Sequence, residues 1–154
     1  MRHASAGDIP ALALVWHDAW HAGHAHLDPE IAARRPMAFF IERMSAPLEE
    51  YSVAVDNGRV VGFSRWEGDG IAQVFVLPAY HGTGVAALVL RAAEEALLAQ
   101  GHTRIWLQCR KGNDRARRFY EKHGWIVVAD VDHDMGHMDG RSPVIVWRLE
   151  KSLA

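Results

Sequence analysis

The sequence predicts an α/β (α+β) fold, with a single mixed, mostly antiparallel, six- to seven-stranded sheet flanked by about four helices. The chain has 154 residues, the size of one ordinary domain, so residues 1–154 are expected to form a single domain. Hydrophobic residues make up 49% of the chain and charged residues 23%, as is typical of a protein with a buried core. The apolar period changes from helical to strand-like at Tyr51 and becomes helical again after Gly84, so strands and helices do not alternate regularly.

The first fifty residues predict one short strand and two helices. Residues 1–4 form the strand, and Ser5 or Asp8 then caps the first helix. The apolar face of this helix consists of Ile9, Leu12, Ala13, Trp16, Ala19 and Trp20. A second helix is expected over residues 29–44 with a break at Pro36, because proline fits the first turn of a helix and interrupts its interior.

Three strands are expected to follow as an antiparallel meander. Runs of β-prone residues cover 51–55 and 59–66, and the residues between them, Asp56-Asn57-Gly58, tolerate the positive φ of a tight hairpin turn. A third strand covers residues 71–77 after a second polar turn. Consecutive strands joined by such short turns pair with each other, so these three strands predict half of the sheet.

The remaining sequence predicts a helix over 84–100, a buried strand over 103–109 and a helix over 113–123. Two apolar strands are expected over 125–131 and 144–149, separated by a polar loop. The last strand is predicted to be exposed, and an exposed strand edge could pair with a second copy in a homodimer.

Composition and charge exclude several classes of function. The formal net charge is −2, so the chain lacks the overall basic field that gathers phosphate backbones, and no nucleic-acid partner is expected. Cys109 is the single cysteine, which excludes an internal disulfide and fits a reducing compartment. No apolar stretch approaches membrane-spanning length and the N-terminus lacks the apolar core of a signal peptide, so a cytoplasmic protein without a membrane partner is predicted.

A glycine-rich turn between a strand and a helix predicts an anion site. Pro78 ends the strand ladder, and Gly82-Thr83-Gly84 leads into the helix. The first N–H groups of a helix have no internal acceptor and lie at the positive end of the helix dipole. Glycines in front of them let a pyrophosphate approach the backbone, because no Cβ stands in the way.

The sequence of this turn admits three alternative interpretations. Residues 82–87 also satisfy the Gly-x-Gly-x-x-Ala dinucleotide fingerprint, which requires an acidic residue about twenty positions later. The next strand instead ends in Gln108-Cys109-Arg110, and the turn follows an antiparallel meander, so a nicotinamide cofactor is disfavoured. No Gly-Lys-Ser/Thr follows, which excludes a nucleoside-triphosphate loop. A purely structural strand-to-helix turn accounts for one of the two glycines and remains an alternative.

A second motif lies downstream of the glycine turn. The segment from Asn113 to Trp125, Asn-Asp-Arg-Ala-Arg-Arg-Phe-Tyr-Glu-Lys-His-Gly-Trp, resembles the Asn-x-x-Ala-x-x-Phe-Tyr-x-x-x-Gly-Phe segment of the GNAT superfamily of acetyl-CoA-dependent N-acetyltransferases. The glycine turn upstream resembles that family's Arg/Gln-x-x-Gly-x-Gly/Ala element, although His81 replaces the usual Arg or Gln. The resemblance covers mainly residues 51–150. It implies a GNAT-like acyltransferase fold, a single N-acetyltransferase domain and acetyl-CoA as co-substrate.

The resemblance also implies which residues bind the coenzyme. The strand before the glycine turn would separate from the strand at 105–109, and the pantetheine arm would lie in the gap. The residues implied are Val74, Phe75, Val76, His81, Gly82, Thr83, Gly84, Val85, Ala86, Asn113, Arg117 and Tyr120. Tyr120 would stand near the thioester sulfur and act as a general acid. From spacing alone, a core tyrosine is an equally good interpretation of this residue.

The general base and the acceptor site are less well defined by sequence. Many relatives carry a glutamate where this chain has Gly70, and its neighbours Asp69 and Glu67 are candidate bases, although turn chemistry explains Asp69 equally well.

In the histidine-rich segment and the last loop, Trp20, His21 and His137 are candidate acceptor-binding residues. No metal site is expected, because a helix followed by a loop does not ensure that three ligands converge. The predicted acceptor is an amine of a small molecule, an amino acid or a peptide. A non-catalytic coenzyme A-binding sensor is the alternative.

Overall fold

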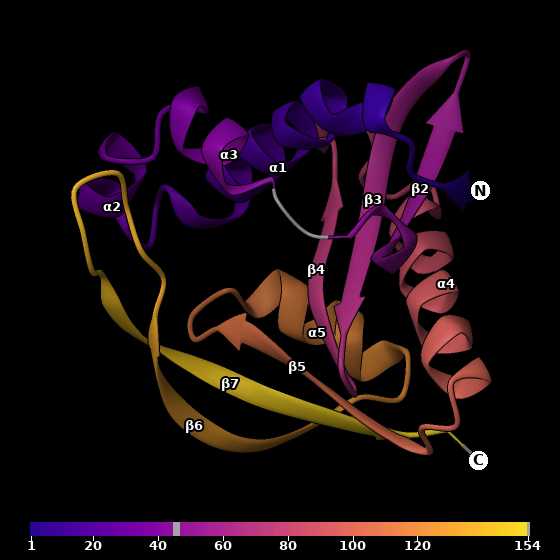
Figure 1. Ribbon diagram of the computed structural model, residues 1–154. Coiled ribbons are helices and arrows are strands. Elements are labelled where there is room, and N and C mark those ends of the chain that lie inside the picture. Colours follow the sequence, from indigo (N-terminus) through magenta and orange to yellow (C-terminus); the bar gives the residue numbers. More distant parts are fainter. Residues whose placement is uncertain (45–46, 154) are drawn as a thin grey trace.

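The computed structural model describes residues 1–44 and 47–153 and confirms the predicted mixed sheet (Figure 1). Its seven strands lie in the order β1-β2-β3-β4-β5-β7-β6. Their bounds are β1 Arg2–His3, β2 Tyr51–Asp56, β3 Arg59–Glu67, β4 Gly70–Val76, β5 Arg104–Arg110, β6 Ile126–Asp134 and β7 Pro143–Ser152. Neighbouring strands are antiparallel except for β4 and β5, which are parallel.

The helices agree with the predicted pattern. Their bounds are α1 Ile9–His24, α2 Pro29–Ala33, α3 Met37–Arg43, α4 Val85–Ala99 and α5 Asp114–Lys122, with short 3₁₀ turns at Ala6–Asp8, Leu48–Glu50 and Pro78–Tyr80. The predicted break at Pro36 is confirmed, and it divides the second expected helix into α2 and α3. Helix α1 continues through His24, so the first helix extends into the histidine-rich segment.

Helices α1 and α4 cover opposite faces of the strands β2 to β4. Successive side chains of a strand point to opposite faces, so Gly62 and Phe63 of β3 face different helices. The Phe63 ring lies 5.9 Å from that of Phe75 in β4, which in turn lies 6.4 Å from the Trp16 ring of α1. A Cβ added at Gly62 would lie 3.1 Å from the side chain of Val85, at the start of α4. Both faces of this half of the sheet are therefore buried.

Strands β4 and β5 stay together for a short distance only. They pair through Gly70 with Trp106 and through Ile71 with Leu107. The register between β3 and β4 shifts beside this point, which leaves Ala72 as an extra residue in β4. Such a bulge bends a strand and increases its local twist. Beyond it the two strands diverge and the sheet opens (Figure 1).

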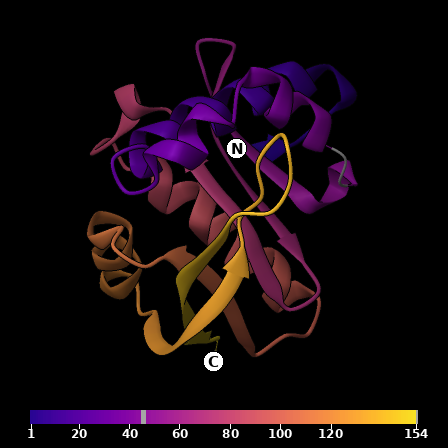
Figure 2. The ribbon, with the colours of Figure 1, turned by 90° about the vertical axis from the view of Figure 1, so that its left-hand side faces the viewer.

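The N-terminal helices are tied to the C-terminal half of the sheet. Asp28, between α1 and α2, accepts two hydrogen bonds of 2.9 Å from the guanidinium of Arg110 at the end of β5. The buried Arg35, between α2 and α3, donates to the carbonyls of Met135 and Gly136 in the loop between β6 and β7. Figure 2 shows this loop reaching up against the helices. These contacts hold α1 beside the gap between β4 and β5.

The predicted exposure of the last strand is wrong. Strand β7 pairs with β5 on one side and with β6 on the other, so it lies inside the sheet. The open edge belongs to β6, where Ile126 and Val128 are exposed. The homodimer remains a prediction, and pairing through β7 cannot support it.

The ion pair between Asp28 and Arg110 generates a prediction about stability. Replacing Asp28 with Asn should lower the free energy of unfolding by about 2–4 kcal/mol, because a largely buried guanidinium loses its charge partner. Urea denaturation measures this loss. Glu121→Gln breaks a more exposed ion pair with Arg117 and should change stability by less than about 1 kcal/mol. Equal effects of the two substitutions would contradict a structural role for Asp28.

Candidate active site

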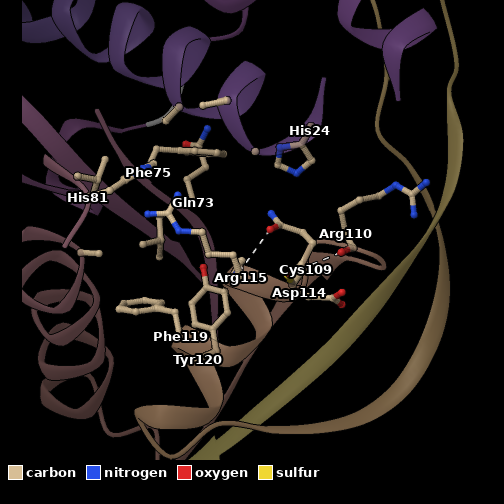
Figure 3. A pocket seen from close by; sticks show the side chains of 18 of the residues that line it. His24, Gln73, Phe75, His81, Cys109, Arg110, Asp114, Arg115, Phe119 and Tyr120 are labelled. Carbon is tan, nitrogen blue, oxygen red and sulfur yellow. Dashed lines mark hydrogen bonds between the residues drawn. The ribbon is translucent and has the colours of Figure 1, made fainter. Parts of the chain in front are cut away.

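A cleft of about 800 Å³ opens where β4 and β5 diverge. One side is formed by β4 from Ala72 to Val76 and by the glycine turn before α4. The other side is formed by the end of β5 and by α5, and the last two turns of α1 close the top (Figure 3). The cleft therefore lies between two strands whose backbone edges do not pair with each other.

The glycine turn presents free backbone donors to this cleft. Gly82 and Gly84 have φ of +78° and +89°, and a Cβ added to either would meet no atom within 4 Å. The amide of Leu88 is the first in α4 to donate to a carbonyl within the turn, that of Gly84 at 3.1 Å. The preceding amides, from Val85 to Ala87, begin the helix without such an acceptor, which makes this end of the cleft suited to an anion.

Most residues predicted for the coenzyme line the cleft. Val74, Phe75, Val76, His81, Gly82, Gly84, Ala86, Asn113 and Tyr120 do so. Thr83 instead turns its hydroxyl to the carbonyl of Tyr80. Val85 packs toward Gly62 of β3. Burial and the neighbouring Arg115 lower the pKa of His81, so its imidazole is mainly neutral at pH 7.

Helix α5 turns one face to the cleft. Asn113 caps the helix by accepting a hydrogen bond of 3.3 Å from the amide of Ala116. The residues of α5 that follow at helical spacing, including Arg115 and Tyr120, line the cleft. Arg117 lies outside this lining, with its guanidinium 4.7 Å from the Trp147 ring. Sequence reasoning named Arg117 and missed Arg115, although the phase of the helix distinguishes the two positions.

Tyr120 and Cys109 both line the cleft and lie near each other. Tyr120 is 9% exposed, and its burial, followed by the proximity of Cys109, raises the pKa of the phenol well above its usual value. Burial also raises the pKa of the Cys109 thiol to about 12. Both groups therefore hold their protons at neutral pH.

The two carboxylates predicted as candidate bases lie elsewhere. Asp69 accepts a hydrogen bond of 2.9 Å from Nε1 of Trp106, and Glu67 is largely exposed beside Arg65. Neither Asp69 nor Glu67 is among the described residues that line the cleft. At Gly70, where relatives are expected to carry glutamate, an added Cβ would lie 2.9 Å from the Trp106 indole. The family's usual position for a base is thus closed to a side chain here.

The three residues predicted for the acceptor also lie outside the lining of the cleft. Trp20 is 2% exposed, and Nε2 of His21 lies 2.8 Å from the carbonyl of Arg35. His137 is buried in the loop between β6 and β7, beside a separate cavity of about 320 Å³. The polar side chain of α1 that does line the cleft is His24, four residues after Trp20. The small residues Ala19, Ala22 and Gly23 on the same surface are the sequence signal for this face.

Within residues 1–44 and 47–153, no group of three or more His, Cys, Asp or Glu side chains is arranged to hold a metal ion. None of the helices in this part of the chain is both long and apolar enough to cross a membrane.

Comparisons with known proteins agree with this geometry. Residues 13–125 match the sequence profile of the acetyltransferase (GNAT) family. An uncharacterized N-acetyltransferase of Mycobacterium tuberculosis is 32% identical over 129 residues, which cover 80% of this chain and 83% of the relative. The chain belongs to the acetyltransferase (GNAT) family.

Solved structures show the same fold. A GCN5-related N-acetyltransferase of Rhodopseudomonas palustris superposes with a TM-score of 0.79 at 22% identity, over 99% of this chain and 94% of the other. PaiA N-acetyltransferase of Thermoplasma acidophilum, solved in complex with coenzyme A, superposes with a TM-score of 0.70 at 18% identity, over 98% and 96% of the two chains. The predicted GNAT-like fold is therefore confirmed.

The glycine turn generates a prediction about binding. Gly84→Ala should weaken coenzyme A binding about tenfold, because an L-residue at positive φ strains the turn that presents the amides. Isothermal titration calorimetry measures the Kd. Gly101→Ala is the matched control, because Gly101 has φ of +94° at the far end of α4. Equal losses of affinity in both variants would show that the turn has no special role in binding.

Proposed function

We propose that this chain transfers an acetyl group from acetyl-coenzyme A directly to a primary amine of a small molecule, an amino acid or a peptide. The observation that carries the proposal is the separation of β4 from β5, with free amides at one end of the cleft and a buried phenol in it. Membership of the acetyltransferase family supports the reaction class.

The residues of the cleft fit the coenzyme. The backbone amides of Gly82, Gly84, Val85 and Ala86 would hold its diphosphate, with Arg115 as a nearby cation. The backbone edge of Val74–Val76 would pair with the pantetheine arm, and the Asn113 amide would lie beside it. When bound, acetyl-CoA supplies an acyl group activated as a thioester.

The side chains at the base of the cleft fit direct transfer. An amine attacks as the neutral base, and the departing sulfur needs a proton. Tyr120 would donate that proton, since its phenol is protonated and lines the cleft. Cys109 would not carry the acetyl group, because its thiol is protonated at neutral pH and the thiolate is the nucleophilic form.

A non-catalytic coenzyme A sensor is the second candidate. The closed position at Gly70 favours it, because the usual carboxylate base is missing there. The protonated Tyr120 in the cleft favours an enzyme.

We also propose a cytoplasmic location, because a chain with a single cysteine fits a reducing compartment. Residues 1–154 would form one acetyltransferase domain.

Two measurements test the proposal. Coenzyme A should raise the melting temperature by mass action and NAD should not. Thiol release from acetyl-CoA in the presence of spermidine, L-lysine or trialanine then separates an enzyme from a sensor. Binding without thiol release with any of these amines would favour the sensor, and a shift with NAD alone would contradict coenzyme A binding.

Tyr120 supplies a prediction about turnover. Tyr120→Phe should lower kcat by about 100-fold while leaving the Kd for coenzyme A nearly unchanged, because the phenyl ring keeps its packing and loses the proton. Tyr80→Phe is the control, since that hydroxyl bonds to Asp56 outside the cleft at 2.7 Å. Unchanged turnover in Tyr120→Phe would remove Tyr120 from the mechanism.

A further inference from the structure

We propose that His24 is the general base of the transfer, with Nε2 accepting the proton that the attacking amine loses. This inference rests on the proposed function and assigns the role that the closed position at Gly70 leaves open. It is carried by the place of His24 in the cleft, by the hydrogen bond that fixes its tautomer and by its neighbours.

His24 lies at the end of α1 and lines the cleft. Figure 3 shows its imidazole reaching down from α1, across the cleft from Tyr120 on α5. Ala22 and Gly23, which precede it, also line the cleft and carry no functional group. A Cβ added at Gly23 would lie 3.5 Å from Nδ2 of Asn113, so α1 closely approaches the predicted coenzyme site. An amine held under α1 would meet His24 on this side.

A single hydrogen bond determines the tautomer of His24. Its Nδ1 lies 2.9 Å from the carbonyl oxygen of Trp20. A carbonyl oxygen can only accept, so Nδ1 carries the hydrogen and the neutral ring has its lone pair on Nε2. The ring also stacks on the Trp20 indole, with centroids 4.9 Å apart and planes inclined by 3°. The basic nitrogen is therefore held in one orientation before a ligand binds.

The surroundings keep this imidazole neutral. Burial lowers the pKa of His24 to about 4, with further lowering by Arg35 and Arg110, against the opposing effects of the Trp20 carbonyl and Asp28. Arg35 lies on the Trp20 ring, with its guanidinium carbon 4.5 Å from the centroid. At pH 7 the ring is therefore unprotonated and able to accept a proton.

Other titratable side chains of the cleft fit the role less well. Asp114 and His26 are exposed to solvent, and His81 lies beside the glycine turn at the end suited to phosphates. His123 also lines the cleft, but it follows α5 and packs its ring on Phe119, with centroids 4.8 Å apart. Cys109 and Tyr120 hold their protons and cannot serve as bases at neutral pH. Among the described residues that line the cleft, His24 combines partial burial, a fixed tautomer and a place opposite Tyr120.

The step balances without another reactant. The lone pair of the amine forms the new bond to the acetyl carbon, and the electron pair of the broken carbon–sulfur bond goes to sulfur. The N–H proton moves to Nε2 of His24, while sulfur takes the phenolic proton of Tyr120. Water then returns the proton from His24 to Tyr120, leaving an amide and a free thiol.

The test compares His24→Gln with the matched control His26→Gln, because both histidines line the cleft and His26 is exposed. His24→Gln should lower kcat about 100-fold for the best amine among spermidine, L-lysine and trialanine, with the Kd for coenzyme A unchanged within about twofold. In His26→Gln, kcat and the Kd for coenzyme A should both stay within about twofold of the wild-type values. Asp114→Asn is measured alongside as the rival base.

A spectroscopic readout is independent of turnover. Nitrogen-15 NMR of the free wild-type protein should show His24 with the hydrogen on Nδ1 and a titration midpoint near the pKa of about 4. A hydrogen on Nε2, or turnover by His24→Gln within about threefold of wild type, would overturn the assignment while the proposed function stands. A large loss in Asp114→Asn with none in His24→Gln would move the role to Asp114. Absence of thiol release by the wild-type protein would overturn both proposals.

Discussion

The early separation of β4 from β5 is the constraint on which the rest of this structure depends. Two parallel strands pair at Gly70 and Ile71 and then diverge beside the bulge at Ala72. The unpaired backbone that results needs a partner, and the cleft places the free amides of the glycine turn beside it. A ligand with an anionic end and an extended, amide-bearing arm satisfies both sets of groups. Coenzyme A has this shape, which is why the fold and the family lead to the same ligand.

Buried charges hold the top of the cleft. The ion pair of Asp28 with Arg110 joins the segment between α1 and α2 to the end of β5, and the Arg35 side chain joins the segment between α2 and α3 to the loop between β6 and β7. Arg35 also lies on the Trp20 ring, whose other contacts include the stacked imidazole of His24. The contacts that position α1 therefore also orient the proposed base, and its burial, followed by the charges of Arg35 and Arg110, lowers its pKa, so stability and chemistry are coupled in this region.

Sequence reasoning succeeded where the signal is local. The glycine turn, the helix expected over 113–123 and the break at Pro36 each follow from chemistry within a few residues, and each is found in the structure. It was less informative where packing decides. The order of β7 and β6 in the sheet follows from how two distant strands meet β5, which no local pattern reports. The candidate base was missed for the same reason, because the tautomer and surroundings of His24 arise only after α1 packs.

The central claim is that the gap between β4 and β5 holds a thioester beside the buried phenol. A crystal structure of the complete chain with acetyl-CoA tests it most directly. The account predicts diphosphate oxygens within hydrogen-bonding distance of the amides of Val85 and Ala86, the pantetheine arm along Val74–Val76, and the sulfur next to the Tyr120 hydroxyl. A coenzyme bound outside this cleft, or one whose sulfur points away from Tyr120, would contradict it.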